Sequence, residues 1–152
     1  MADRSPTSSP PAHPDLVRPA IAALPVGTFL MTSCFDGKRA GVLVRSVQSI
    51  ADEPPLLGVS IRRGHPIEPI IRDSRHFAIC MLDPADKLAL RKFADGPKRD
   101  ADPFDALPLE TLLSQSPILR RAPLAFDCEV TRNLDLEADC GLYVGVIIAV
   151  RQ

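Results

Sequence analysis

The chain has 152 residues and a mass of 16.5 kDa, which fits a single domain. Its 18 Lys and Arg residues nearly balance 19 Asp and Glu residues, and this excludes a general electrostatic attraction to nucleic acid or to an anionic membrane. The longest apolar run, residues 142–150, is shorter than the roughly 20 residues that span a bilayer.

The cysteines and the N-terminal residues, which include no apolar signal core, indicate the cellular compartment of the protein. Four cysteines lie far apart without a C-x-x-C pair, which favours free thiols over a disulfide framework or a metal site. We therefore expect a cytoplasmic protein with no metal ligands. Residues 1–14 are rich in Ser, Thr and Pro and predict a disordered tail, so the folded domain is expected to span residues 15–152.

The periodicity of the remaining chain predicts short helices among strands. Asp15 can cap a helix whose apolar side includes Leu16 and Ile21, and further helices are expected at residues 66–74, 86–94 and, shorter, 109–114. Residues 96–108 are expected to form a surface loop. Strands are predicted at residues 26–34, 38–47, 56–61, 76–82, 124–132 and 142–150. The Asp36-Gly37 pair predicts a tight turn that joins the first two of these strands in a hairpin. This pattern predicts a mainly β or α+β domain.

The most informative stretch, residues 40–61, combines strands with a polar, serine-containing loop and a Pro-Pro break. Ser46 and Ser49 offer hydroxyl donors in the loop, and Arg45 offers a cation. A basic turn follows, in which Arg62 and Arg63 precede the amides of Gly64 and His65 at a helix entry. These donors suit an anionic cofactor, although the same arginines are also compatible with a solvated charged face.

An ordered set of motifs resembles the flavin reductase-like, FMN-binding split barrels. The set comprises Leu24-Pro25-Val26-Gly27, Thr32, Gly41, the run from Arg45 to Ala51, Pro54-Pro55-Leu56, Ile70-Ile71-Arg72-Asp73-Ser74, Phe77-Ala78, Phe93-Ala94 and Gly145. The resemblance covers roughly residues 16–150.

The resemblance implies an antiparallel split β-barrel with short flanking helices that forms a homodimer. It also implies that NAD(P)H transfers hydride to bound FMN or FAD, often for a partner monooxygenase, and that no catalytic side chain is required. The cofactor-binding residues that we expect are Arg45, Ser46, Val47, Ser49, Ala51, Arg62, Arg63, Gly64, His65 and Phe93.

Several positions depart from the family pattern. Ala51 and Pro66 lack the hydroxyls common in the family, and Ala138-Asp139-Cys140 stands where many members carry Gly-Asp-His near the nicotinamide. Two alternatives to a reductase follow. One is a flavin carrier, sensor or accessory protein that does not turn over, and the other is a degenerate barrel retained for assembly.

Overall fold

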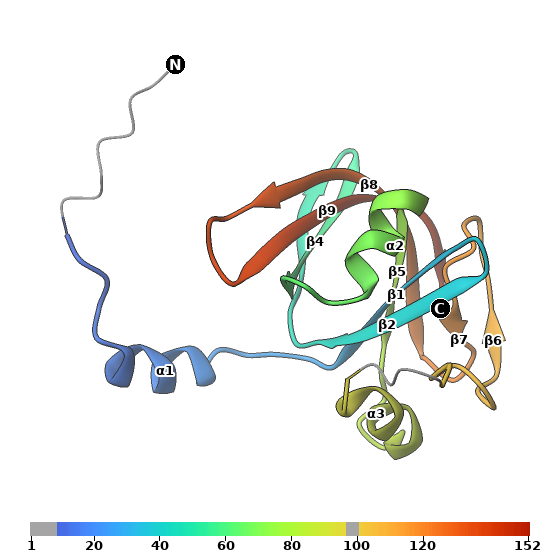
Figure 1. Cartoon of the computed structure of the whole chain (residues 1–152), viewed down its shortest axis with the longest axis horizontal. Helices are drawn as coiled ribbons and strands as arrows, with labels where there is room; N and C mark the ends of the chain where they lie inside the picture. Colours follow the sequence, from blue (N-terminus) through green and yellow to red (C-terminus); the bar gives the residue numbers. More distant parts are fainter. Residues whose placement is uncertain (1–8, 97–100) are drawn as a thin grey trace.

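The computed structural model describes residues 9–96 and 101–152, so part of the predicted tail, residues 1–8, lies outside the described residues. The elements follow in the order α1 (Pro14–Ala22), β1 (Phe29–Phe35), β2 (Lys38–Val44), β3 (Val47–Asp52), β4 (Pro55–Arg62), α2 (Ile67–Ser74), β5 (His76–Met81), α3 (Lys87–Ala94), β6 (Leu109–Glu110), β7 (Ile118–Leu119), β8 (Leu124–Asp135) and β9 (Cys140–Arg151) (Figure 1).

Seven strands form one antiparallel sheet in the order β2-β1-β5-β8-β9-β4-β3, and β6 pairs with β7 separately. Asp36 and Gly37 form the β1–β2 turn with φ values of 50° and 76°. These positive angles explain the Asp-Gly pair, because glycine adopts them without a steric penalty. The predicted hairpin is confirmed.

The sheet curls toward a barrel because its two edge strands are consecutive in the chain. Only Arg45 and Ser46 separate β2 from β3, although these strands lie at opposite ends of the strand order. A connection of this length spans roughly 10 Å at most. The ends of the two edges must therefore approach each other, and β2 also contacts β4.

The sheet is buried on both faces. Along β1, Leu30 belongs to one core cluster and the next residue, Met31, to the other, and along β5 Phe77 and Ala78 divide in the same way. Helix α3 and the segment around Phe104 contribute to the first cluster, whereas α2 contributes to the second. Burial on both faces explains why these strands are continuously apolar rather than alternating.

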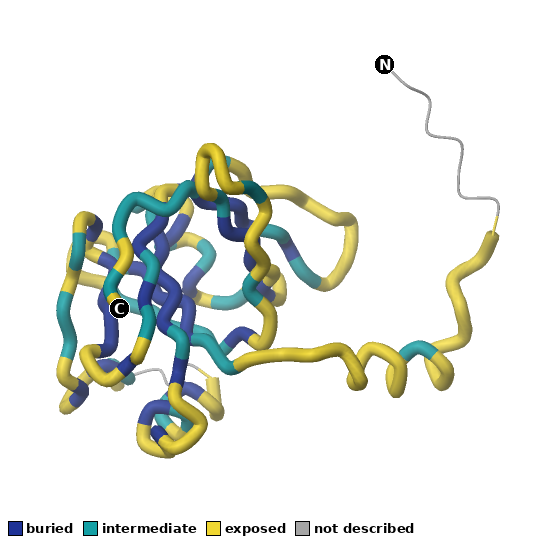
Figure 2. Tube along the Cα trace, turned by 180° about the vertical axis from the view of Figure 1, so that it is seen from behind, coloured by how far each residue is buried: buried dark blue, intermediate teal, exposed yellow. Residues whose placement is uncertain are grey.

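The N-terminal helix α1 extends away from the barrel (Figures 1 and 2). His13 caps it by accepting a hydrogen bond from the Asp15 amide at Nδ1, at 3.3 Å. None of its residues is buried. The expectation that Asp15 caps this helix is wrong, because the helix begins at Pro14 and His13 supplies the capping acceptor. No helix in residues 9–96 and 101–152 has the length and apolar character needed to cross a membrane.

Helices α2 and α3 agree with the prediction, but three other expectations are wrong. The polar loop after β2 is limited to Arg45 and Ser46, because residues 47–52 form β3 with a bulge between Ser49 and Ala51. The predicted helix at 109–114 is replaced by β6 and an irregular segment. The expected surface loop at 96–108, of which 97–100 lie outside the described residues, contains buried Phe104 and Leu107.

Candidate functional site

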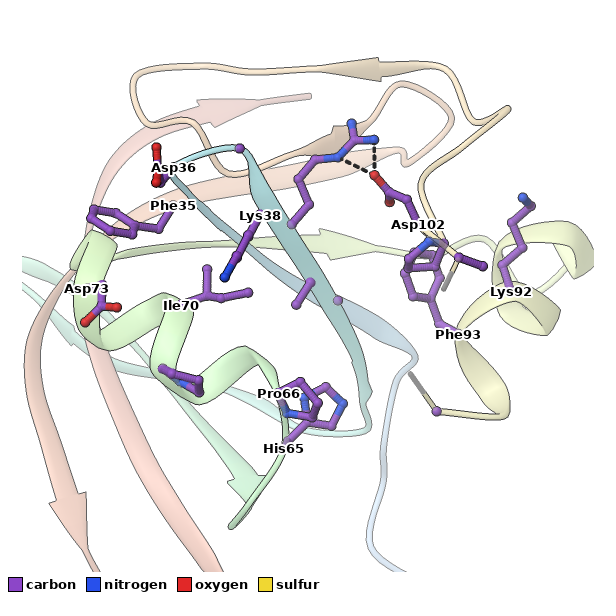
Figure 3. Close-up of a pocket in the computed structure, with 18 residues that line it drawn as sticks. Phe35, Asp36, Lys38, His65, Pro66, Ile70, Asp73, Lys92, Phe93 and Asp102 are labelled. Atoms are coloured by element: carbon purple, nitrogen blue, oxygen red, sulfur yellow. Dashed lines mark hydrogen bonds and ion pairs between the residues drawn. The ribbon is translucent and has the colours of Figure 1, made fainter. Parts of the chain in front are cut away.

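A cavity of about 710 Å³ lies between β2, α2 and the segment that follows α3 (Figure 3). The β1–β2 turn and β2 form one wall, α2 and the turn before it form another, and the end of α3 with residues 101–103 completes the site. Its cationic side chains are Lys38, Arg39 and Lys92. Carboxylates also line it, and apolar groups cover the rest, among them Ile70 and Phe93.

An ion pair joins two walls of the cavity. The Nε atom of Arg39 donates a hydrogen bond to Oδ2 of Asp102 at 2.9 Å, and a second guanidinium nitrogen contacts the same oxygen. The Arg39 guanidinium also lies over the Phe104 ring, 5.4 Å from its centroid. Lys92 donates to the Asp105 carbonyl at 2.8 Å. These contacts hold residues 102–105 beside β2 and α3.

Gly41 on β2 allows two aromatic rings to pack against the strand. A Cβ atom at this position would lie 2.8 Å from the Phe93 ring and 3.1 Å from the Phe104 ring. The two rings contact each other in a tilted arrangement, with their centroids 5.1 Å apart. The absence of a side chain at Gly41 thus sets the position of Phe93 in the cavity.

His65 enters the cavity from the turn between β4 and α2. Its Nδ1 accepts a hydrogen bond from the Ile67 amide at 3.1 Å. The neutral imidazole therefore carries its proton on Nε2, which leaves that nitrogen as a donor. Burial lowers the pKa of His65, and nearby Glu68 opposes this shift only in part. The imidazole is thus neutral at neutral pH.

Of the expected cofactor-binding residues, His65 and Phe93 line this cavity, and the others lie elsewhere. Arg45 is exposed and lines a second cavity, beside α1. Ser46 is exposed in the two-residue connection. On β3, Val47 pairs with Val59, and Ser49 and Ala51 flank the bulge.

Arg62 and Arg63 pair with the β8–β9 hairpin rather than lining the cavity. Arg62 lies 3.4 Å from an Asp139 carboxylate oxygen, and Arg63 forms an ion pair with Asp135. Asp139 belongs to the Ala138-Asp139-Cys140 triplet that replaces the family's Gly-Asp-His. Phosphate binding by these arginines, expected from the sequence, stays a prediction.

The Gly64 amide is also engaged within the chain. It donates a hydrogen bond to Oε2 of Glu68 at 2.8 Å, while the other oxygen of that carboxylate accepts from the Tyr143 hydroxyl at 3.1 Å. Burial and the adjacent Glu68 charge raise the pKa of Tyr143 to about 12. Glu68 thus connects the entry of α2 to β9, and a ligand phosphate would have to compete with its carboxylate for the Gly64 amide.

The sequence did not predict four residues that line the cavity, Lys38, Arg39, Lys92 and Asp102. The position of Lys92 beside Phe93 offered a weak signal. Asp102 offered none, because it lies 63 residues from its partner Arg39 in an irregular segment.

The sequence profile of the flavin reductase like domain matches residues 21–152, most of the chain. The chain belongs to this family. The flavin reductase-like assignment made from the motifs is thereby confirmed. The matched region extends from the end of α1 through the C-terminal strand β9.

Several bacterial relatives of this flavin reductase-like chain share one name, FMN reductase (NADH) RutF. The FMN reductase (NADH) RutF of Stutzerimonas stutzeri is 28% identical over 135 residues, covering 89% of this chain and 77% of that protein. RutF of Pantoea ananatis is 32% identical over 116 residues, covering 76% of this chain and 60% of that protein.

Solved structures confirm the fold of this flavin reductase-like chain. The NADH:FAD oxidoreductase SgcE6 of Streptomyces globisporus superposes with a TM-score of 0.82 at 23% identity, covering 94% of this chain and 89% of that one. The styrene monooxygenase flavin reductase SMOB of Pseudomonas putida S12 superposes with a TM-score of 0.73 at 24% identity, covering 89% of this chain and 85% of that one. The mainly antiparallel α+β architecture expected from the sequence is therefore confirmed.

Proposed function

We propose that this chain is an NADH-dependent flavin reductase that binds FMN in the 710 Å³ cavity. One observation carries the location: His65 and Phe93, which the family resemblance assigns to the flavin, converge there from separate elements. The family profile and the relatives named FMN reductase (NADH) support the activity over a carrier without turnover.

The chemistry of the cavity fits a flavin mononucleotide. Its volume falls within the roughly 300–1,000 Å³ typical of small-molecule sites. Phe93, Ile70 and Pro66 offer apolar surface for a planar ring, whereas Lys38, Arg39 and Lys92 offer positive charge for a phosphate. An open cavity of this size also argues against a degenerate barrel whose pocket is filled by side chains.

A bound flavin would supply the redox chemistry, because its ring accepts a hydride from a reduced nicotinamide. The residues of the chain bind and orient it. The Nε2 proton of His65 is available as a hydrogen-bond donor to the cofactor, and Arg39 with Asp102 holds the wall that carries Phe104. Six further residues expected from the sequence remain proposed contacts to the flavin: Arg45, Ser46, Ser49, Arg62, Arg63 and Gly64.

Three finer assignments belong to the same proposal. We infer NADH as the donor, FMN before FAD as the flavin, and a homodimer as the assembly. RutF relatives are named for NADH and FMN, whereas SgcE6 is named for FAD. A two-component oxygenase or halogenase is the proposed class of acceptor partner, since SMOB and the tryptophan halogenase component BorF are reductases of such systems.

A carrier that binds flavin without reducing it is the second candidate. The observation that favours it is the triplet Ala138-Asp139-Cys140, in which Cys140 stands where many family members carry a histidine and Asp139 pairs with Arg62. Steady-state oxidation of NADH with added FMN separates the candidates, because a carrier gives only background turnover.

An absorption and fluorescence titration with FMN, followed by anaerobic addition of NADH, tests the proposal. We expect saturable binding and bleaching of the flavin absorbance near its long-wavelength maximum. His65→Asn and Phe93→Leu should each weaken FMN binding several-fold, and Ser46→Ala and Arg63→Ala should do so if the loop and basic turn also contact the cofactor. Binding that none of the four variants alters would place the flavin elsewhere.

A further inference from the structure

Glu68, at the start of α2, joins the turn before that helix to strand β9. Its Oε2 accepts a hydrogen bond from the Gly64 amide at 2.8 Å, and its Oε1 accepts one from the Tyr143 hydroxyl at 3.1 Å. Its own amide donates to the His65 carbonyl at 3.0 Å. The side chain and the amide of one residue thus hold the backbone on both sides of His65.

Tyr143 gives this network a rigid anchor. It lies on β9, where it pairs with Val59 of β4, and it is only 3% exposed. Its raised pKa of about 12 keeps the hydroxyl protonated at neutral pH, so the hydroxyl donates to the Glu68 carboxylate. Hydrogen bonds to an ionised group are roughly twice as strong as those between neutral groups. The carboxylate is therefore held by the barrel as well as by α2.

The turn that carries His65 depends on hydrogen bonds because packing contributes little to it. Arg63, Gly64 and Pro66 are all exposed. Gly64 adopts a φ of 82°, and no atom lies within 4 Å of the place where its Cβ would be. The Arg63 amide donates to the Asp139 carbonyl at 3.0 Å, and the next amide along the chain is the one that Glu68 accepts from. Without the Glu68 carboxylate, the backbone would be free to turn just before His65.

His65 lines the 710 Å³ cavity, whereas Glu68 does not (Figure 3). Glu68 lines a separate open cavity of about 290 Å³ beside the β8–β9 hairpin. The Nδ1 atom of His65 accepts a hydrogen bond from the Ile67 amide at 3.1 Å, and this bond determines that the neutral ring carries its proton on Nε2. The bond requires the backbone from Gly64 to Ile67 to keep its course, which is what Glu68 secures.

We propose that Glu68 is a positioning residue for the cofactor site: by bridging Tyr143 and Gly64, it fixes the His65 imidazole as a donor to the bound flavin. This inference rests on the proposed function, since it requires flavin in the 710 Å³ cavity. Glu68 itself does not touch the cofactor. A donor that is already fixed before binding loses little conformational entropy when the ligand arrives, so loss of the bridge weakens binding.

The tautomer of His65 in the protein without flavin tests the first step. In a nitrogen–proton correlation NMR spectrum recorded well above the ordinary histidine pKa of 6.5, His65 should be the Nε2–H tautomer. Glu68→Leu should give a mixture of both tautomers. Glu68→Gln keeps an acceptor for Gly64 and a partner for Tyr143, so it should retain the wild-type signal. His65→Asn identifies that signal. An unchanged tautomer in Glu68→Leu overturns the inference and leaves the proposed function intact.

Fluorescence titration with FMN tests the second step. Glu68→Leu should raise the dissociation constant about tenfold, and Glu68→Gln by less than about twofold. Tyr143→Phe removes one of the two contacts of the carboxylate and should raise it about threefold, which keeps the test available if Glu68→Leu does not fold. Glu129→Leu, at an exposed position of β8, is the control and should leave the affinity unchanged.

A double-mutant cycle separates positioning from a general loss of stability. In the His65→Asn background, Glu68→Leu should cost no further affinity, because the donor that it positions is already absent. A further loss of about tenfold in that background overturns the inference. Tighter FMN binding by Glu68→Leu also overturns it, because the freed Gly64 amide would then contact the phosphate directly. A wild-type chain without saturable FMN binding overturns the proposed function, and the cofactor role of Glu68 with it.

Discussion

Arg39 on β2 donates to Asp102 at 2.9 Å, across the wall of the large cavity. Both side chains are about one third exposed, so the pair itself is worth only about 1 kcal/mol after solvent screening. Loss of the pair removes one of the contacts that hold residues 102–105 beside β2. We expect Arg39→Met and Asp102→Asn each to raise the dissociation constant for FMN roughly fivefold, measured by fluorescence titration.

The two substitutions also separate positioning from charge. Asp102→Asn keeps the Arg39 cation, so tighter FMN binding in that variant would show that the cation acts directly and that the pair does not position the wall. Arg91→Met, on the exposed side of α3, is the control and should leave the affinity unchanged.

Gly41→Ala should reduce both stability and FMN affinity. The new Cβ would lie 2.8 Å from Phe93, so the ring must shift at a cost of about 1–3 kcal/mol. Gly145→Ala meets Phe77 at 2.7 Å, and Phe77 does not line the cavity. It should lower the melting temperature similarly but leave FMN affinity intact. Equal affinities in the two variants would contradict a role for Gly41 in placing Phe93.

His65 should make stability depend on mildly acidic pH. Its folded pKa lies below the ordinary value of 6.5, so the unfolded chain takes up the proton first as pH falls. The free energy of unfolding should therefore decrease as pH falls below 6.5, until the folded pKa is reached. Chemical denaturation at pH 7 and pH 5 should show a smaller decrease for His65→Asn. An identical decrease in both proteins would exclude this contribution.

Asp127 should be required for folding of the segment before β7. The buried carboxylate accepts hydrogen bonds from the Leu113 and Ser114 amides at 2.9 and 2.7 Å, and from the Ser114 hydroxyl at 2.6 Å. Asp127→Asn replaces one acceptor oxygen by a donor that faces these groups. We expect a loss of about 2–4 kcal/mol in urea unfolding, against almost none for exposed Asp105→Asn.

Cys80 and Cys128 should resist thiol reagents until the chain unfolds. Burial raises their pKa values to about 11 and about 12. At pH 8, a chromogenic disulfide reagent should react promptly with Cys34 and Cys140, which are only partly buried, and with all four free thiols in denaturant. Four prompt reactions in the native protein would contradict the burial of this pair.

The same two thiols predict alkaline destabilisation. Their folded pKa values exceed the ordinary 9.0, so the unfolded chain loses protons first as pH rises above that value. The stability that they contribute is complete below pH 9 and is lost toward pH 11–12. Unfolding of Cys80→Ala between pH 8 and 11 should show a shallower decline than wild type.

The sequence by itself determined most of the strands, helices α2 and α3, and the family, because these depend on local patterns. Alternating or continuous apolar runs and the Asp36-Gly37 turn act over a few residues, and each is found where expected. The family motifs likewise keep their order along the chain. Such signals need no knowledge of which elements become neighbours.

Only the tertiary structure decided which residues line the cavity and whether the apolar side of α1 is buried or exposed. Arg39 and Asp102 meet across 63 residues of sequence, and Phe104 packs on Gly41 from a segment that reads as a surface loop. The burial of such groups depends on which elements pack together, and residue types alone do not fix that choice. The same reason explains why a helix with an apolar side, Pro14–Ala22, has no buried residue.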